Sequence, residues 1–182
     1  MCGICGELRL KQGPADQDNI RTMLGPLRPR GPDDGGIFSA GQIALGHRRL
    51  AIIDLSAAAQ QPMLSADQSL AIVFNGTIYN YPQLRQQLQG LGYAFKSSGD
   101  TEVILQAYRH WGAECVHHLV GMFAFAIWDA RINKLFMARD RLGIKPLYYS
   151  QTGNSFLFAS NTQALLATGE IDSAIDPQAL QH

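Results

Sequence analysis

The chain has 182 residues, of which 46% are hydrophobic and 16% are charged, with no long polar tract or break in composition. We therefore expect one globular domain with a proper core. Fifteen basic residues balance fifteen acidic ones and no segment concentrates the basic side chains, which argues against nucleic acid or an anionic membrane as a partner.

The sequence also lacks the signals that would direct it into or across a membrane. No apolar run approaches the roughly 20 residues that cross a bilayer, and the N-terminus lacks the basic and apolar regions of a signal peptide. We therefore expect a cytoplasmic protein. Three cysteines cannot all pair within one chain, and a reducing compartment keeps them as thiols. A special role for any of them would be chemical.

The first third of the chain alternates between strand and helix patterns. Residues 2–10 alternate between the two faces of an extended chain and predict a half-buried strand. A helix is predicted next from apolar residues at helical spacing, namely Ile20, Met23, Leu24 and Leu27. The Pro- and Gly-rich stretch 29–36 ends this helix in a loop. Two short strands are predicted around Ile37 and over residues 43–53.

The middle of the chain is predicted to be mainly helical. A compact apolar strand over residues 70–74 runs into Asn75 and Gly76, which we place at the strand end. A helix over residues 80–91 starts with an Asn and a nearby Pro. A second helix is predicted over residues 101–111, where apolar side chains share one side, and a short helix follows it.

The last third is predicted to be an antiparallel meander of four strands. These strands cover residues 122–128, 134–138, 147–150 and 156–160 and are joined by short polar turns. Helices grouped between two sets of strands favour an α+β layered domain over alternating βαβ units. Near the end, Asp176 and Pro177 predict a helix start, but so short a helix is not stable alone. We therefore expect a fragment of a longer protein; a frayed natural tail is the alternative.

Cys2 is the residue most suited to covalent chemistry. Removal of Met1 would leave a thiol and a free α-amine on one residue, and such an amine has a pKa of roughly 7.7–8.0. The amine can take the thiol proton, directly or through a water, which gives a thiolate with its own general base. The alternative is that Cys2 is simply a small buried apolar residue.

A redox or zinc role for the Cys2-x-x-Cys5 pair is disfavoured. Odd spacing on a strand points the two side chains to opposite faces, and a thioredoxin-like pair needs a preceding strand. Zinc would need further ligands from Cys115, His117 and His118, which offer no second close cysteine pair. We therefore predict no metal site.

Four further residues fit the hydrolysis of an amide in a free amino acid. Asn75 and Gly76 can donate a side-chain amide and a backbone N–H to an oxyanion, although Asn-Gly more often marks a turn. Arg49 suits the substrate carboxylate and Asp100 its ammonium. The alternatives are that Arg49 is a surface charge and that Asp100 is the N-cap of the helix at residue 101.

Seven segments occur in an order that points to a known family. They are MCGICG (1–6), RGPD (30–33), GHRRLAIID (46–54), FNGTIYN (74–80), DTEVIL (100–105), GMFAFA (121–126) and ARDRLGIKPLY (138–148). Together they resemble the class II glutamine amidotransferase domain of the asparagine synthetase family. The resemblance covers residues 1 to about 170, and the motifs are highly specific in combination.

The resemblance implies a fold and a domain plan. The fold is that of N-terminal nucleophile hydrolases, a four-layer αββα sandwich of two antiparallel sheets between helical layers. Residues 1–170 would form the glutaminase domain, and residues 171–182 would begin the connection to an ATP-dependent synthetase domain that lies outside the chain. ATP and magnesium are expected in that second domain, and no cofactor is expected in this one.

The resemblance also assigns roles to site residues. It implies Cys2 as the nucleophile, Asn75 and Gly76 as the oxyanion hole, Arg49 and Asp100 as ligands for the glutamine carboxylate and ammonium, and main-chain groups around Ile52 as further substrate contacts. One departure concerns Thr77, which stands where the commoner pattern has a Glu that binds the substrate amino group. Loss of one charge-assisted contact of about 1.5–3 kcal/mol should weaken glutamine binding.

A second set of departures suggests a branch of the family. Asn161 stands where Glu usually follows Ala-Ser, which would affect contact with the synthetase domain. The residue at Thr77, the Cys-Gly-Glu at residues 5–7 and the late segment 175–180 are similar to the branch that makes N-acetylglutaminylglutamine amide. The expected function is hydrolysis of glutamine to glutamate and ammonia, which a second domain uses to amidate a carboxylate.

Two other functions compete with this expectation. The first is a catalytically impaired domain with a structural or regulatory role, motivated by Thr77 and by Met1, which would block the α-amine if retained. The second is an N-terminal nucleophile amidase for acylated amines, against which the pairing of Arg49 with Asp100 argues. The expected partners are glutamine, the synthetase domain and a second copy in a homodimer.

Overall fold

The chain folds around two antiparallel sheets. The computed structural model describes residues 1–51 and 56–174. The five-stranded sheet has the order β2-β3-β1-β9-β8, with bounds β1 Gly3–Arg9, β2 Asp34–Ala40, β3 Ile43–Arg49, β8 Tyr148–Gln151 and β9 Ser155–Ala159. The four-stranded sheet has the order β4-β5-β6-β7, with bounds β4 Met63–Leu64, β5 Leu70–Ile78, β6 Gly121–Asp129 and β7 Lys134–Arg139.

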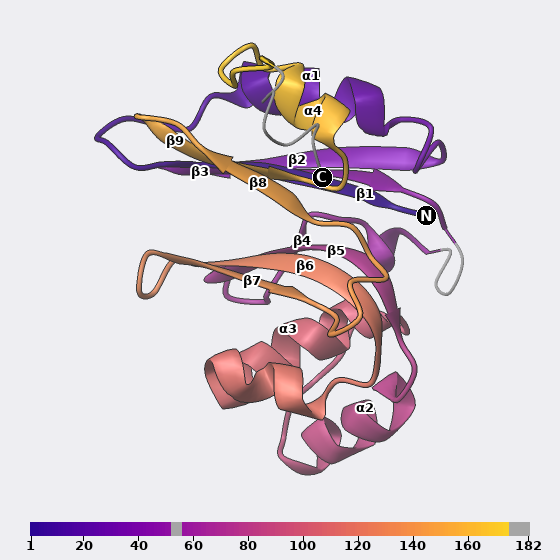
Figure 1. Cartoon of the computed structure of the whole chain (residues 1–182). Helices are drawn as coiled ribbons and strands as arrows, with labels where there is room; N and C mark the ends of the chain where they lie inside the picture. The colour runs from indigo at the N-terminus through magenta and orange to yellow at the C-terminus, as the bar shows by residue number, and fades with distance from the viewer. Residues whose placement is uncertain (52–55, 175–182) are drawn as a thin grey trace.

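Helices cover the outer face of each sheet, as Figure 1 shows. The five-stranded sheet carries α1 (Gln17–Leu27) and α4 (Thr162–Leu166). The four-stranded sheet carries α2 (Tyr81–Gly90), α3 (Asp100–Trp111) and the 3₁₀ helix η2 (Gly112–His118), while a short 3₁₀ helix η1 covers Ala57–Ala59. The predicted α+β class and the four-layer αββα sandwich are confirmed.

Three apolar clusters hold these layers together. The first lies between α2, α3 and the four-stranded sheet and includes Phe125, and the second lies between α1, α4 and the five-stranded sheet. The third joins the inner faces of the two sheets and includes Ile4 and Phe158. Each layer therefore buries one side against its neighbour, which is how such sandwiches remove apolar surface from water.

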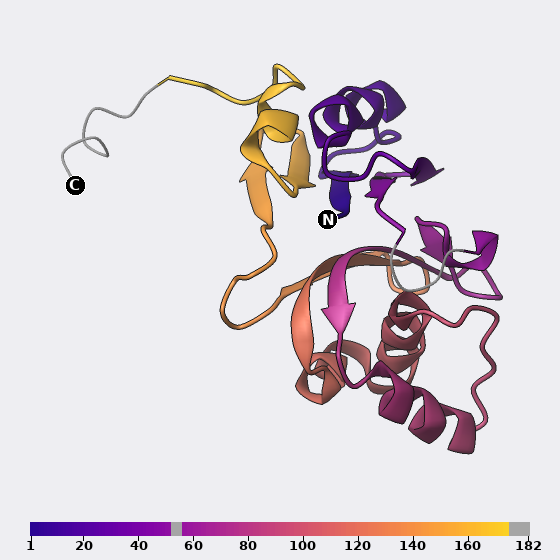
Figure 2. The ribbon, with the colours of Figure 1, turned by 90° about the vertical axis from the view of Figure 1, so that its right-hand side faces the viewer.

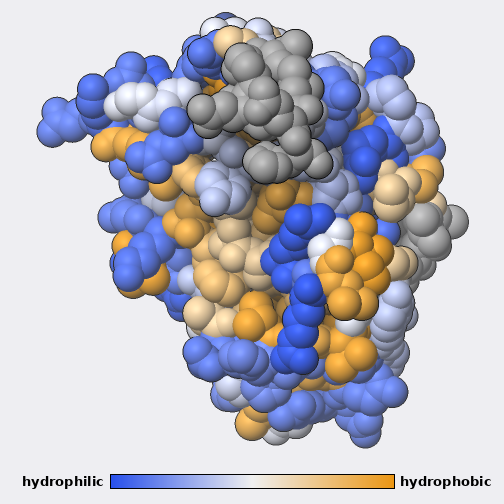
Figure 3. Space-filling model, viewed as in Figure 1, coloured by the Kyte–Doolittle hydropathy of each residue, from blue (hydrophilic) through white to orange (hydrophobic). Residues whose placement is uncertain are grey.

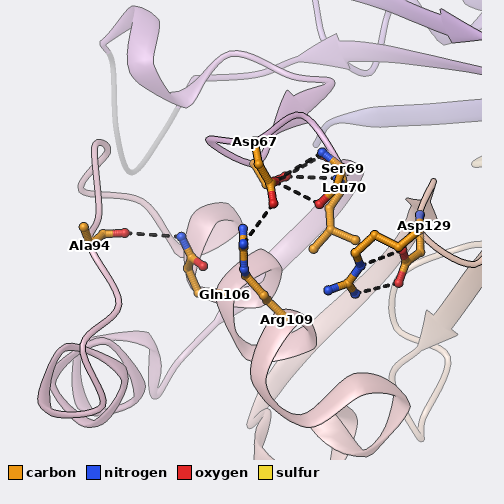
Figure 4. A network of polar contacts seen from close by, with 9 residues as sticks. Asp67, Ser69, Leu70, Ala94, Gln106, Arg109 and Asp129 are labelled. Carbon is orange, nitrogen blue, oxygen red and sulfur yellow. Dashed lines mark hydrogen bonds and ion pairs between the residues drawn. The ribbon is translucent and has the colours of Figure 1, made fainter.

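A polar network ties α3 to the edge of the four-stranded sheet (Figure 4). Arg109 of α3 donates to Asp67 at 2.9 Å, and Asp67 also accepts from the Ser69 hydroxyl at 2.9 Å and the Ser65 hydroxyl at 2.7 Å. These hydrogen bonds hold the pKa of the Asp67 carboxyl well below its usual range. The helix that begins at Asp100 is thereby fixed at its other end.

The first strand is more deeply buried than predicted. Its first five residues are all buried, because β1 lies in the middle of its sheet with an apolar layer on each side. Ile4 packs between the two sheets and Cys5 packs with α1. The prediction of a half-buried strand was therefore wrong, although the alternation of side chains was right.

Two other local predictions need correction. Asn75 and Gly76 lie inside β5 and pair with Ala124 and Phe123 of β6, so they do not mark the strand end. Gly76 is required there by a close approach, since a Cβ would lie 2.3 Å from the carbonyl oxygen of Met122. In α2 the apolar face includes Leu84 and Leu88, but Leu91 follows the helix and is 50% exposed.

The predicted meander is divided between the two sheets. The pair β6 and β7 belongs to the four-stranded sheet, whereas β8 and β9 belong to the five-stranded one. The chain leaves the four-stranded sheet at Asp140. The Asp140 carboxylate accepts hydrogen bonds from the backbone N–H groups of Phe123, Ile144 and Lys145 at 2.8–3.1 Å. This turn ends the β7 ladder and directs the chain across to β8.

The sequence patterns missed α4 altogether, because it has five residues. Its start is set by Asn161, whose side chain accepts from the backbone N–H of Ala164 at 2.8 Å. The predicted helix start at Asp176 and Pro177 lies outside the described residues. Among the helices in the described part of the chain, none is long and apolar enough to cross a membrane.

One face of the molecule is rich in apolar surface. The segment between β7 and β8 and the start of β8 carry exposed apolar side chains, with Leu142 86%, Ile144 53% and Tyr149 69% exposed. Figure 3 shows apolar residues gathered across the middle of this face, between the two helical layers.

Figure 2 shows that the N-terminus lies at the junction of the two halves of the molecule, where the candidate site is built.

Candidate active site

The residues predicted to form the site converge on one cavity. This cavity of about 220 Å³ lies at the junction of the two sheets and is lined by the two residues before β1, the end of β3, the second half of β5 and the start of α3. The predicted residues that line it are Cys2, Arg49, Asn75, Gly76, Thr77 and Asp100. Ile52 lies outside the described residues, although its neighbour Ala51 is part of the lining.

Cys2 is the accessible thiol of the three. Its Sγ lies 3.4 Å from the backbone nitrogen and 3.7 Å from the carbonyl oxygen of Leu50, so the main chain of Leu50 holds the thiol in place. Its main-chain carbonyl accepts from Arg30 Nε at 3.1 Å, which fixes the residue at the cavity. By contrast, Cys5 and Cys115 are fully buried, and burial raises the pKa of the Cys5 thiol and raises that of Cys115 to about 12. Buried thiols of this kind are inert.

The outer edge of β5 presents a row of backbone groups to the cavity. Alternate residues of a strand point their N–H and C=O groups to the same side. Phe74 N–H donates to Gln61 Oε1 at 2.7 Å, and Ile78 N–H donates to Asp100 Oδ2 at 3.0 Å. Gly76 stands between them with the same parity, so its N–H points to the same edge and into the cavity that Gly76 lines.

The side chain of Asn75 supplies a second donor. Asn75 is 1% exposed and lines the cavity. Its Nδ2 has no hydrogen-bond partner within the part of the chain that the structure describes. Because buried amide groups are almost always paired, this donor is available for a ligand. Together with the Gly76 N–H, it forms the pair of donors expected of an oxyanion hole.

Buried charges of both signs complete the lining. Arg49 is 8% and Asp100 is 5% exposed, and Arg49 donates to the Ser56 carbonyl at 3.2 Å. Burial raises the pKa of Asp100 even though the N–H groups of Ile78, Asp100 and Thr101 favour its charged form. Asp100 is the first residue of α3 and Gly99 is its N-cap, so the interpretation of Asp100 as a helix cap was wrong.

Several lining residues were not among the predicted ones. Gln61 and Thr101 contribute polar groups, and Lys145 brings a third charge that is 6% exposed, with its Nζ 3.2 Å from the Sδ of Met1. Lys145 belongs to the motif ARDRLGIKPLY, which was a signal that could have singled it out. Gln61 is followed by a Pro, and nothing in that local pattern marks it as a site residue.

His47 is fully buried, and its Nε2 lies 3.2 Å from the carbonyl oxygen of Phe74, which lines the cavity. Burial lowers the pKa of His47 from 6.5 to about 4. Between these pH values the unfolded chain binds a proton that the folded chain does not, so the free energy of unfolding rises with pH across this window. Between pH 7 and pH 4.5 the free energy of unfolding falls in both proteins. The fall is expected to be about 2 kcal/mol smaller in His47→Gln than in the wild type.

Urea unfolding of both proteins at the two pH values checks this prediction. Because the comparison is a difference of differences, the carboxylates that also titrate in this range cancel to first order. An equal loss of stability in the two proteins would show that His47 accepts a proton in the folded state as readily as in the unfolded one.

Comparisons with known proteins point to the same family as the site. A model of the glutamine amidotransferase domain matches residues 1–182. Asparagine synthetase (glutamine-hydrolysing) 3 of Bacillus subtilis is 41% identical over 97% of this chain, and synthetase 1 of the same organism is 41% identical over all of it. In both cases the chain spans 29% of the relative's length.

A solved structure agrees with the fold. Glutamine phosphoribosylpyrophosphate amidotransferase from Bacillus subtilis, complexed with ADP and GMP, superimposes with a TM-score of 0.78 and 25% identity, over 92% of this chain and 44% of that one. The fold, the cavity and the sequence matches lead to one conclusion. The chain belongs to the family of glutamine amidotransferase domains and is an enzyme domain of that class.

Proposed function

We propose that this domain hydrolyses glutamine to glutamate and ammonia, with Cys2 as its N-terminal nucleophile once Met1 has been removed. The observation that supports this most directly is the cavity that brings together the Cys2 thiol, the donors of Asn75 and Gly76, and the buried charges of Arg49 and Asp100. A free amino acid with a side-chain amide presents a carboxylate, an ammonium and an electrophilic carbon, and each has a counterpart in this lining.

The chemistry proceeds in two steps. The Cys2 α-amine takes the thiol proton, and the thiolate attacks the δ-carbonyl carbon of glutamine to form a tetrahedral intermediate. The oxyanion accepts from Asn75 Nδ2 and Gly76 N–H. The protonated amine then gives its proton to the leaving nitrogen, the C–N bond breaks and ammonia departs. Water activated by the amine attacks the γ-glutamyl thioester and releases glutamate and the thiol.

We further propose that the ammonia is used by a second domain of a longer protein. Support comes from the share of the Bacillus subtilis asparagine synthetases that this chain spans, 29% of each. In that domain ATP and magnesium would activate a carboxylate acceptor, so neither is needed for the chemistry at Cys2. The acceptor proposed from the residue at Thr77 and the segment 175–180 is the precursor of N-acetylglutaminylglutamine amide.

Turnover assays separate this proposal from its competitors. The processed domain is expected to release glutamate from glutamine and to leave simple acyl amides of the same chain length intact, because Arg49 and Asp100 match only the free amino acid. Preferential cleavage of acyl amides would instead indicate an amidase for acylated amines. Absence of any turnover, with glutamate still bound, would favour a structural or regulatory domain. The assay is run on the full-length protein as well as on the domain.

Thr77 provides a test of how the substrate ammonium is held. It follows Asn75 on the same face of β5 and lines the cavity. Thr77→Glu is expected to lower the KM for glutamine by about tenfold with little change in kcat, since a charge-assisted hydrogen bond contributes at least about 1.5 kcal/mol. Thr77→Gln, which has the same length without the charge, is the control. If both variants change KM equally, the carboxylate is not the cause.

A further inference from the structure

The edge of β5 loses its strand partner just before the oxyanion donors. On this edge β4 pairs only with Ala71 and Ile72. From Phe74 onward the backbone groups on that side have no neighbouring strand within the described residues. A buried N–H or C=O left without a partner costs free energy and leaves the strand free to twist.

Two buried side chains take the place of the missing strand at Phe74. Gln61 Oε1 accepts the Phe74 N–H at 2.7 Å, and His47 Nε2 lies 3.2 Å from the Phe74 carbonyl oxygen. The two come from different parts of the molecule. His47 belongs to β3 of the five-stranded sheet and is fully buried, while Gln61 precedes β4 and is 8% exposed.

The hydrogen bond of His47 fixes which ring nitrogen carries the proton. A carbonyl only accepts, so Nε2 is the donor and Nδ1 holds a bare lone pair. Nδ1 is buried and has no partner in the described chain. A residue selected only for packing at this place would not carry an unpaired polar atom, because an apolar side chain would avoid that cost. The imidazole is therefore better explained by the hydrogen bond that it donates.

The backbone of Phe74, which His47 and Gln61 contact, is directly connected to the proposed oxyanion donors. The Phe74 carbonyl and the Asn75 nitrogen belong to one peptide plane, and the Gly76 N–H follows one residue later. Gln61 also donates through Nε2 to Thr101 Oγ1 at 3.3 Å, next to Asp100. The same side chain thus links the β5 edge to the start of α3, where the ammonium site is proposed.

We propose that His47 and Gln61 are positioning residues. They hold the N–H and the carbonyl of Phe74 so that Asn75 Nδ2 and Gly76 N–H meet the oxyanion of the tetrahedral intermediate. The inference rests on the proposed glutamine hydrolysis. Oxyanion donors act through preorganisation, and small displacements of such groups cost large factors in rate. Neither side chain needs to touch the substrate's reacting atoms for this effect.

The test compares His47→Met, which removes the donor, with His47→Gln, whose Nε2 keeps an N–H donor of similar reach. For His47→Met, kcat with glutamine is expected to fall by roughly 10- to 100-fold while KM changes by less than about threefold. His47→Gln is expected to recover most of the loss. Wild-type kcat in His47→Met, measured on protein that still binds glutamate, would overturn the proposal.

A second readout reports on the oxyanion site alone. Glutamate γ-semialdehyde forms a tetrahedral adduct with a Cys2 thiolate, whereas glutamate binds through its carboxylate and ammonium without one. The ratio of the two inhibition constants is expected to shift by roughly the same 10- to 100-fold in His47→Met. Loss of both affinities together would mean a general structural defect and would contradict a positioning role.

Gln61→Met tests the second of the two side chains that contact the Phe74 backbone. It removes the acceptor for Phe74 N–H and, if His47→Met does not fold, it carries the same prediction of an altered inhibition ratio. An unchanged ratio in folded Gln61→Met would then overturn the proposal. A wild-type protein that binds glutamate but forms no aldehyde adduct and releases no glutamate from glutamine would instead refute the proposed function, so the two failures are distinguishable.

Discussion

Replacement of Cys2 by serine in the processed domain is expected to lower the rate of glutamate release by at least about 10⁴-fold, as removal of a catalytic nucleophile does in other hydrolases. A hydroxyl loses its proton far less readily than a thiol, so at neutral pH the serine forms much less of the reactive anion than the cysteine does. The two side chains are nearly isosteric, and the fold should be retained. The measurement is glutamate release at saturating glutamine, with thermal unfolding as the check on structure.

Cys115→Ala is the matched control for this prediction. Cys115 is fully buried in the cluster beneath α3 and does not line the cavity. Its removal should lower the unfolding temperature slightly and leave kcat within about twofold of the wild type, because a small buried side chain contributes packing alone. A serine variant at position 2 that retains more than a hundredth of the activity would place the nucleophile elsewhere.

Asn75→Ala is expected to produce the second largest effect. Loss of one oxyanion donor typically costs 10²- to 10³-fold in kcat, and the KM for glutamine should change little because the ground-state carbonyl is not held by the donor. Asn75 Nδ2 has no partner in the described chain, so loss of this donor breaks no hydrogen bond among the described residues. Steady-state kinetics with glutamine, together with titration of glutamate binding, measures both quantities.

Asn80 offers a control of the same residue type near the end of the same strand. Its side chain donates to the His118 carbonyl at 2.9 Å and accepts from Val120 N–H at 3.0 Å, so its role is to join two segments of the fold. Asn80→Ala should reduce stability by about 1–3 kcal/mol and leave kcat near the wild-type value. If Asn75→Ala behaves like Asn80→Ala, the oxyanion role of Asn75 is wrong.

The sequence predicted the main site residues because they lie in ordered motifs. Cys2, Arg49, Asn75 and Asp100 each had an ordinary structural alternative when taken alone, and the combination of motifs removed it. Their convergence on one cavity could not be predicted from spacing, since these residues are far apart in the chain and meet only at the junction of the two sheets. Gln61 was missed because its role arises just before β4, where the pairing of β4 with β5 stops, and this leaves no periodic signal.

The fold was predicted better in class than in detail. The α+β class followed from the grouping of helices and strands, but the assignment of strands to sheets did not. Hairpins have the same local pattern whichever sheet they join, so the transfer of the chain at Asp140 was invisible. The burial of β1 on both faces requires two covering layers, and a single alternating strand does not reveal how many layers it meets.

Mass analysis shows whether Cys2 of the processed chain is the nucleophile. The protein is measured intact before and after treatment with 6-diazo-5-oxo-norleucine, a glutamine-like electrophile, and the adduct is located by peptide mapping. We expect a chain without Met1 that carries a single adduct on Cys2, with Cys5 and Cys115 unmodified because both are buried. A chain without Met1 that binds glutamate but leaves Cys2 unlabelled would contradict the account and favour a domain without catalytic activity.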